Sequence, residues 1–230
     1  MSESNLTIVY YTSNKIPDKF AENTRNQLTH AVGNLPLITV SQKPMNFGRN
    51  ICVGDIGTTH LNIYRQALIG AKKANTKYIA MAEDDVLYSP EHFLYIPRPN
   101  HFAYDKHIWA IYTWSKPPVF SWKDRINLYA MICERDLFIE AMEERFAKWP
   151  DDSKISLGHW AEPGKYESRN HLGVTERNIE IYFAKVPSIA FSHQTALSFS
   201  NLGTRKKLGV LQAFEIPVWG KAEDIVRLYE

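Results

Sequence analysis

The stretch from Tyr78 to Phe93, YIAMAEDDVLYSPEHF, decides the fold of this chain. Lys77 to Ala82 is a continuous apolar run, which is typical of a central strand buried on both faces. Three consecutive acids, Glu83 to Asp85, follow this run at once. Ser89 and Pro90 then supply an N-cap and a first helical residue, so a short helix is expected to begin there. The stretch therefore predicts a buried strand that ends in a cluster of carboxylates.

Strand and helix patterns alternate before this stretch. The predicted elements are strands at Leu6–Tyr11 and Pro36–Val40, and helices at Lys19–Val32 and Thr58–Ala74, the second capped by Thr58 or Thr59. Such alternation favours an α/β fold with a mostly parallel central sheet flanked by helices.

The second half of the chain is less regular. It offers strands at His107–Trp114, Ile126–Cys133, Ile179–Phe183 and Ser188–Ser192, helices at Asp136–Phe146 and Ala222–Leu228, and a polar, Gly-rich stretch at 151–175. No Pro/Ser-rich linker divides the 230 residues, so residues 1–230 are expected to form a single domain.

Composition narrows the class of protein only a little. With 44% hydrophobic and 23% charged residues, the chain has the make-up of a folded globular protein. A net charge of +2 excludes neither nucleic acid nor saccharide partners. The N-terminus lacks a basic segment followed by an apolar core, and no membrane span is expected, which favours a cytoplasmic location. Cys52 and Cys133 are expected to be buried thiols.

Polar residues follow three of the predicted strands. Thr12 to Asn14, Ser41 to Lys43 and Glu83 to Asp85 each come directly after an apolar run. Because ligands of parallel α/β sheets bind at the carboxyl ends of the strands, these segments should surround one crevice.

The three acids indicate a cation site. Adjacent carboxylates repel one another and lose hydration unless a cation compensates their charge. Oxygen ligands suit Mg²⁺ or Mn²⁺, which often complete their coordination with water and substrate phosphates. A solvated acidic turn is the structural alternative.

Taken with the helix before it, this stretch resembles the GT-A nucleotide-sugar glycosyltransferases, particularly small phage and metagenomic members with an E-x-D-V-L-Y segment. Their D-x-D motif ends a central strand, and Glu83-x-Asp85 matches it with glutamate first. The resemblance covers roughly residues 5–200 as an order of elements. It is specific only around 77–93, at Glu162-Pro163-Gly164 and near His193. It implies a Rossmann-like GT-A fold whose first half, about 1–90, binds the nucleotide sugar and whose second half, about 91–230, binds the acceptor.

The resemblance also implies roles for individual residues. Asp85 would bind Mn²⁺ or Mg²⁺ directly, and Glu83 or Asp84 would contact the ribose or a metal-bound water. Glu83 and His193 are further candidate metal ligands. The donor would be a nucleotide sugar, with a UDP-sugar favoured. Its nucleotide would be lined by Thr12, Ser13 and Asn14, and Lys43 and Arg65 are candidate donor contacts. Lys43 and Arg65 could equally be ordinary solvated cations.

An inverting transferase needs a carboxylate that removes the proton of the acceptor hydroxyl. Glu162, beside Trp160 and in a turn-forming Glu-Pro-Gly context, is the candidate, and a loop-anchoring role is the alternative. Asp151 and Asp152 are the reserve candidates for this catalytic base. The basic run Arg205 to Lys207 could meet phosphates or remain a solvated patch.

The acceptor is left open between a saccharide and a hydroxymethylated pyrimidine in DNA. The second would place the protein in the host cytoplasm if it is phage-encoded, and its basic, aromatic surface would include Trp114, Lys116, Trp122, Lys123 and Arg125. No protein partner is predicted. Two other classes compete with the transferase, a metal-dependent nuclease and a non-catalytic nucleotide-binding module.

Overall fold

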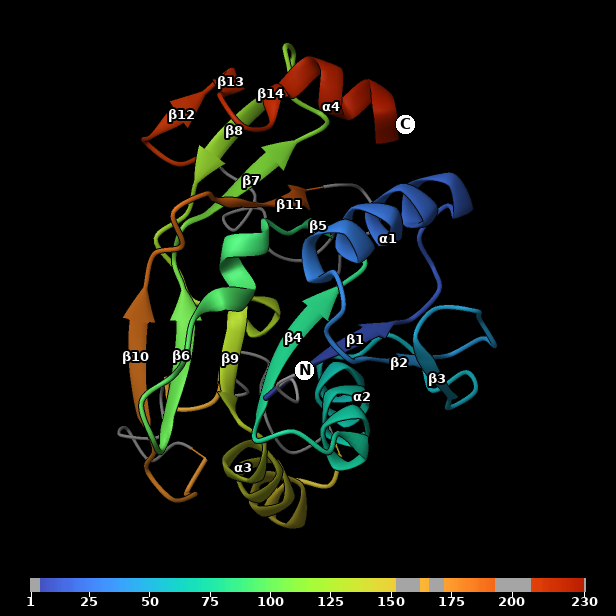
Figure 1. Cartoon of the computed structure of the whole chain (residues 1–230), viewed down its shortest axis with the longest axis vertical. Helices are drawn as coiled ribbons and strands as arrows, with labels where there is room; N and C mark the ends of the chain where they lie inside the picture. The colour runs from blue at the N-terminus through green and yellow to red at the C-terminus, as the bar shows by residue number, and fades with distance from the viewer. Residues whose placement is uncertain (1–4, 152–161, 166–171, 193–207, 230) are drawn as a thin grey trace.

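A seven-stranded sheet forms the centre of the computed structural model, which describes residues 5–151, 162–165, 172–192 and 208–229 (Figure 1). In spatial order its strands are β10 (Asn178–Tyr182), β6 (His101–Asp105), β9 (Met131–Glu134), β4 (Tyr78–Glu83), β1 (Leu6–Thr12), β2 (Leu37–Ser41) and β3 (Arg49–Cys52). β9 runs antiparallel to β4 and β6, and the other neighbouring pairs are parallel. The predicted α/β fold with a mostly parallel central sheet is confirmed.

Helices cover both faces of this sheet. α2 (His60–Lys73) and α3 (Arg135–Lys148) pack on one face, whereas α1 (Asp18–Val32) and the 3₁₀ helix η1 (Pro90–Leu94) pack on the other. The side chains of β1 therefore alternate between two buried cores, with Val9 on the α2 side and Ile8 on the α1 side. Burial on both faces explains the unbroken apolar run from Ile8 to Tyr11 in this strand.

A second, smaller sheet lies beside the first. Its order is β12 (Gln212–Ala213), β8 (Val119–Trp122), β7 (Ile108–Tyr112), β11 (Ser188–Ser192) and β5 (Val86–Leu87). The helix α4 (Ala222–Tyr229) and the hairpin β13 (Glu215–Ile216) and β14 (Gly220–Lys221) complete this region (Figure 1). Since only two residues, Asp84 and Asp85, separate the end of β4 from the start of β5, the acidic turn joins the two sheets.

The predicted elements in both halves of the chain correspond to observed helices and strands, with one exception. The predicted strand Ile126–Cys133 is wrong: residues Leu128–Ala130 form the 3₁₀ helix η2, and only Met131–Glu134 enter the sheet. The backbone N–H of Ala130 donates to the carbonyl of Asn127 at 3.1 Å, a turn that apolar content alone does not reveal. β3, β5, β6 and β8 were not predicted as strands. Cys133 is buried as expected, but Cys52 is exposed on the edge strand β3.

None of the helices within the described ranges is long and apolar enough to cross a membrane.

Close packing of α2 on β1 gives a test of the fold. A Cβ added to Gly70 would overlap Val9 Cγ1 and lie 3.2 Å from Val40 Cγ2, and both valines are fully buried. Overpacking of this kind costs about 1–3 kcal/mol, and better helix propensity offsets up to ~1 kcal/mol. We expect Gly70→Ala to lower the free energy of unfolding by about 1–2 kcal/mol in urea denaturation.

The matched control is the same substitution in a Val9→Ala background, where the overlapping methyl is absent. Gly70→Ala should then cost less, because the new Cβ occupies the space that the valine vacates. An equal cost in both backgrounds would contradict the close contact.

Candidate active site

Backbone and hydroxyl contacts hold the acidic turn in place. The N–H of Glu83 donates to the hydroxyl of Tyr88 at 3.1 Å, and that hydroxyl donates to the carbonyl of Tyr129 at 3.0 Å. On the far side of the turn, the N–H of Phe191 donates to the carbonyl of Asp85 at 2.8 Å. The turn is thus attached to η2 on one side and to β11 on the other.

The ends of β1 and β2 are tied to the same turn. The Thr12 hydroxyl donates to the Asp84 carboxylate and accepts from the N–H of Asn14 at 2.8 Å. Asn14 has a left-handed backbone, with φ of 54°, and its side-chain oxygen accepts from the N–H groups of Gln42 and Lys43, both at 2.9 Å. The expectation that the ends of these three strands surround one crevice is confirmed.

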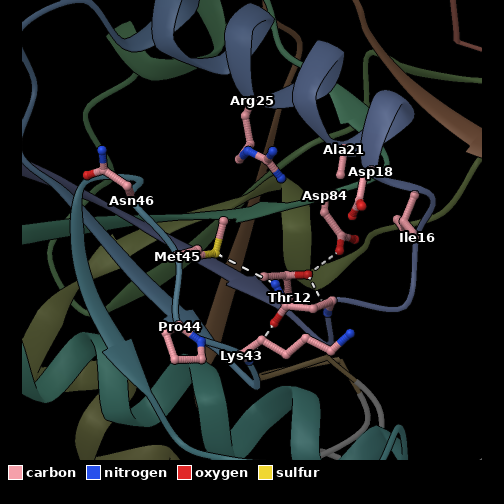
Figure 2. A pocket seen from close by; sticks show the side chains of 11 residues that line it. Thr12, Ile16, Asp18, Ala21, Arg25, Lys43, Pro44, Met45, Asn46 and Asp84 are labelled. Atoms are coloured by element: carbon pink, nitrogen blue, oxygen red, sulfur yellow. Dashed lines mark hydrogen bonds between the residues drawn. The ribbon is translucent and has the colours of Figure 1, made fainter.

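A polar pocket of about 230 Å³ opens at this edge of the sheet (Figure 2). Its lining residues come from the end of β1, from α1, from the loop after β2 and from the acidic turn; they are Thr12, Asn14, Ile16, Asp18, Ala21, Arg25, Lys43, Pro44, Met45, Asn46 and Asp84. Figure 2 shows α1 above the pocket, with Arg25 and Asp18 on the helix side and Lys43 on the opposite side.

The α1 residues of the pocket were missed in the sequence. Asp18, Ala21 and Arg25 stand three and four positions apart, which places them on one face of a helix. Arg25 is half-buried and its positive charge acts on Tyr10, whose pKa burial raises well above the usual value. The spacing could have identified this face, but only the fold shows that it borders the strand ends.

Glu162 joins the acidic turn from a distant part of the chain. The hydroxyl of Tyr104 donates to the carbonyl of Pro163 at 2.7 Å. Gly164 has φ of +83°, and a Cβ there would overlap Ile179, so the turn at 162–165 is held close to β6 and β10. Burial raises the pKa of Glu83 well above its usual value, and the charges of Asp85, Asp84 and Glu162 raise it further. Glu162 therefore lies within electrostatic range of Glu83.

The donor atoms at the turn suit a hard divalent cation. Burial is the main cause of the raised pKa of Glu83, and the negative charges of Asp85, Asp84 and Glu162 raise it further. A cation bound to these oxygens would offset the repulsion among the carboxylates, and carboxylate oxygens are the ligands that Mg²⁺ and Mn²⁺ prefer. Within residues 5–151, 162–165, 172–192 and 208–229, no three His, Cys, Asp or Glu side chains already form a metal-binding group.

Ser13 and Arg65, two further predicted donor-binding residues, differ in their position relative to the pocket. Ser13 is half-buried between the pocket residues Thr12 and Asn14. Arg65 does not line the pocket: it donates to Asn62 Oδ1 at 3.1 Å and to the carbonyl of Pro150. Its role as a donor contact stays a prediction.

Several predicted residues cannot be placed because they lie outside the described part of the chain. These are His193, Trp160, Asp152 and the run Arg205 to Lys207. Their predicted roles are unchanged.

Comparisons with known proteins add a similarity of fold at low identity. No protein-family model and no curated protein matches the sequence. A solved glycosyltransferase involved in glycosylation of the major capsid of PBCV-1 is similar over 81% of this chain and 93% of its own, with a TM-score of 0.49 and 9% identity.

Two further solved structures are similar over shorter parts of their own chains. The apo glycosyltransferase GlyE of Streptococcus pneumoniae TIGR4 has a TM-score of 0.46 and 10% identity, over 76% of this chain and 44% of GlyE. The bifunctional IspDF of Campylobacter jejuni has a TM-score of 0.40 and 9% identity, over 79% of this chain and 50% of its own. At such scores these similarities do not assign an activity.

The bridge made by Asn14 gives a test of how the site is built. In Asn14→Ala, the N–H groups of Gln42 and Lys43 lose their acceptor, and a residue with a Cβ must adopt a left-handed backbone at a cost of about 1–2 kcal/mol. We expect Asn14→Ala to unfold at a lower urea concentration than Asn14→Gly, which loses the same acceptor without the backbone cost. Equal midpoints for the two variants would show that backbone strain contributes nothing here.

The buried carboxylate of Glu83 predicts a pH dependence in the metal-free protein. A carboxyl whose pKa is raised by folding favours the protonated form, so its ionisation destabilises the fold as pH rises above about 4.3. In chelator, Glu83→Gln should therefore have a higher melting temperature than the unmodified protein at pH 7. The difference should shrink as the pH falls towards 4. A variant that is less stable at pH 7 would contradict the electrostatic description.

Proposed function

We propose that this protein is a metal-dependent glycosyltransferase, which moves a sugar from a nucleoside-diphosphate sugar to the hydroxyl of an acceptor. The supporting observation is that Asp84 of the acidic turn lines the polar pocket at the ends of β1 and β2, while the charge of Glu162 acts on Glu83 of the same turn. A UDP-sugar is the favoured donor. Both acceptors considered from the sequence, a saccharide and a 5-hydroxymethylpyrimidine in DNA, are hydroxyl acceptors of this kind.

The pocket would hold the nucleotide part of the donor. Thr12, Ser13 and Asn14 supply backbone and side-chain polar groups at the carboxyl end of β1, where ligands of parallel sheets bind. Arg25 and Lys43 bring two positive charges to the same pocket. Cations suit a diphosphate, because charge-assisted hydrogen bonds to phosphate oxygens are stronger than neutral ones.

Asp85 and Glu83 would hold Mn²⁺ or Mg²⁺, with His193 as the further ligand predicted from the sequence. When bound, the cation supplies positive charge that stabilises the departing diphosphate. The Thr12 hydroxyl orients the Asp84 carboxylate, and the backbone contacts of Glu83 and Asp85 hold the turn rigid. A preorganised turn needs little rearrangement when the donor binds.

Transfer requires one bond to form and another to break at the anomeric carbon of the sugar. The acceptor oxygen attacks this carbon, and the bond to the diphosphate oxygen breaks with its electron pair leaving on the nucleoside diphosphate. Glu162 would take the proton of the acceptor hydroxyl if the configuration inverts. The electrostatic effect of Glu162 on Glu83 supports this role, because it brings the carboxylate within range of the acidic turn.

Release of nucleoside diphosphate tests the proposal. We expect one member of a panel of nucleotide sugars to release its diphosphate in the presence of Mn²⁺ or Mg²⁺. Asp85→Asn should lower that rate by a factor of 100 or more, on the order of the effect of removing an electrostatic stabiliser.

The matched control is Asp224→Asn, which removes an exposed carboxylate on α4 and should leave the rate unchanged. Release that persists in excess chelator, or that is equal in both variants, would argue against a metal site at the turn. Absence of release from every donor would favour a nucleotide-binding module.

A further inference from the structure

A second group of side chains lies across one strand from the acidic turn. β11 stands between β5 and β7 in the smaller sheet, and its residue Phe191 donates to the Asp85 carbonyl. On the other side of β11, Ser192 is in register with Tyr112 at the end of β7. Two strand spacings of about 4.8 Å separate the turn from β7, so the backbone at the end of β7 lies roughly 10 Å from the backbone of the turn.

The end of β7 carries an aromatic pair with a cation. The ring of Tyr112 is 1% exposed and meets Trp114 edge to face, with ring centroids 5.3 Å apart. Trp114 remains 41% exposed. Lys123 Nζ lies 5.5 Å from the centre of the Tyr112 ring. An exposed indole beside a held ammonium group offers a flat apolar surface and a positive charge at one place.

In the segment after β8, the acidic residue Asp124 and the basic residues Lys123 and Arg125 have different neighbours. Asp124 pairs with Lys106, whose carbonyl also accepts from Trp122 Nε1 at 3.0 Å. Asp124, which lies between Lys123 and Arg125 in the sequence, therefore forms its ion pair with Lys106. Among the described residues, Arg125 forms no ion pair with a carboxylate. The pKa of Lys123 is lowered by burial and by the positive charge of Arg125, so the two cations lie close together.

The charge of Arg125 also acts on Tyr129, which is linked to the acidic turn through Tyr88. Burial raises the pKa of Tyr129, while the charge of Arg125 lowers it and the charges of Glu83 and Asp85 raise it. Tyr129 is joined to Glu83 through the Tyr88 hydroxyl. Arg125, Glu83 and Asp85 therefore all lie within electrostatic range of Tyr129, so the cation–aromatic group borders the candidate active site.

We propose that this group is an acceptor subsite for a phosphorylated saccharide. Arg125 and Lys123 would bind the phosphate, and the exposed face of Trp114 would stack on the sugar ring. The inference rests on the proposed transferase and names its acceptor class. The charge pattern orients the acceptor, because the carboxylates repel the phosphate and the cations attract it. A hydroxyl, and not the phosphate, then faces Glu162.

The same arrangement favours a single phosphate over a polynucleotide. Proteins that follow a nucleic-acid backbone place cations along several phosphates and stack successive bases on more than one ring. In this group, as far as the described residues show, two nearby cations, Lys123 and Arg125, accompany one exposed aromatic side chain. Trp122, considered for a DNA-binding surface from the sequence, donates to Lys106 and belongs to the opposite side of the segment.

The test compares acceptors in the presence of the active donor and Mn²⁺. Glucose 6-phosphate and ribose 5-phosphate are set against glucose, ribose and an oligonucleotide with hydroxymethylated pyrimidines. We expect the sugar phosphates to stimulate diphosphate release and to accept the sugar. Arg125→Ala should raise KM for the sugar phosphate by about 10- to 100-fold, the effect of losing a charge-assisted hydrogen bond. KM for the neutral parent sugar should not change.

Lys221→Ala is the control, because this exposed lysine lies on β14, outside the group. Equal stimulation by neutral and phosphorylated sugars, with no effect of Arg125→Ala, would overturn the subsite and leave the transferase standing. Stimulation by the oligonucleotide alone would also overturn it, in favour of a nucleic-acid acceptor.

A binding measurement separates failure of the subsite from failure of the proposed function. Glucose 6-phosphate should quench tryptophan fluorescence in a saturable way, and this quenching should be lost in Trp114→Phe and weakened in Arg125→Ala. This fluorescence measurement requires neither a donor nor turnover, so it tests the subsite even if no nucleotide sugar is cleaved. Absence of saturable quenching in the unmodified protein would overturn the inference.

Discussion

Crowding of like charges at the end of β4 is the constraint on which the site depends. Glu83 is enclosed beside two further carboxylates, and burial together with these charges raises its pKa well above the usual value. A fold accepts such an arrangement only if a cation or a proton compensates it. The contacts of Thr12, Tyr88 and Phe191 hold the turn in this costly geometry. Rigid placement of neighbouring carboxylates is what the proposed metal site requires.

The turn also decides how the two halves of the molecule meet. Since it joins β4 of the large sheet to β5 of the small one, the end of the large sheet lies beside the small sheet. The pocket is formed at the ends of β1 and β2 of the large sheet, whereas Tyr112 and Trp114 lie at the end of β7 in the small sheet, across β11 from the turn. In the proposed transferase the donor and acceptor sides would correspond to the two sheets.

Prediction from the sequence succeeded where local patterns were strong. The apolar runs that became β1, β2 and β4 are buried on both faces, so they needed no partner to be recognised. Short strands such as β5 and β12 have two residues each, and only pairing with distant strands defines them. Arg25 was missed for a similar reason, because a cation on a helix has no marked pattern until the helix is placed above the pocket.

The sequence by itself determined the α/β class, the order of the N-terminal elements and the acidic turn at a strand end, because each depends on periodicity over a few neighbouring residues. It also singled out Glu162, from its turn-forming context. Only the tertiary structure brought Glu162 into the field of Glu83, and only it separated Asp124 from Lys123 and Arg125. These outcomes depend on contacts between residues far apart in the chain, and such contacts are decided by how sheets and helices pack, which local patterns do not encode.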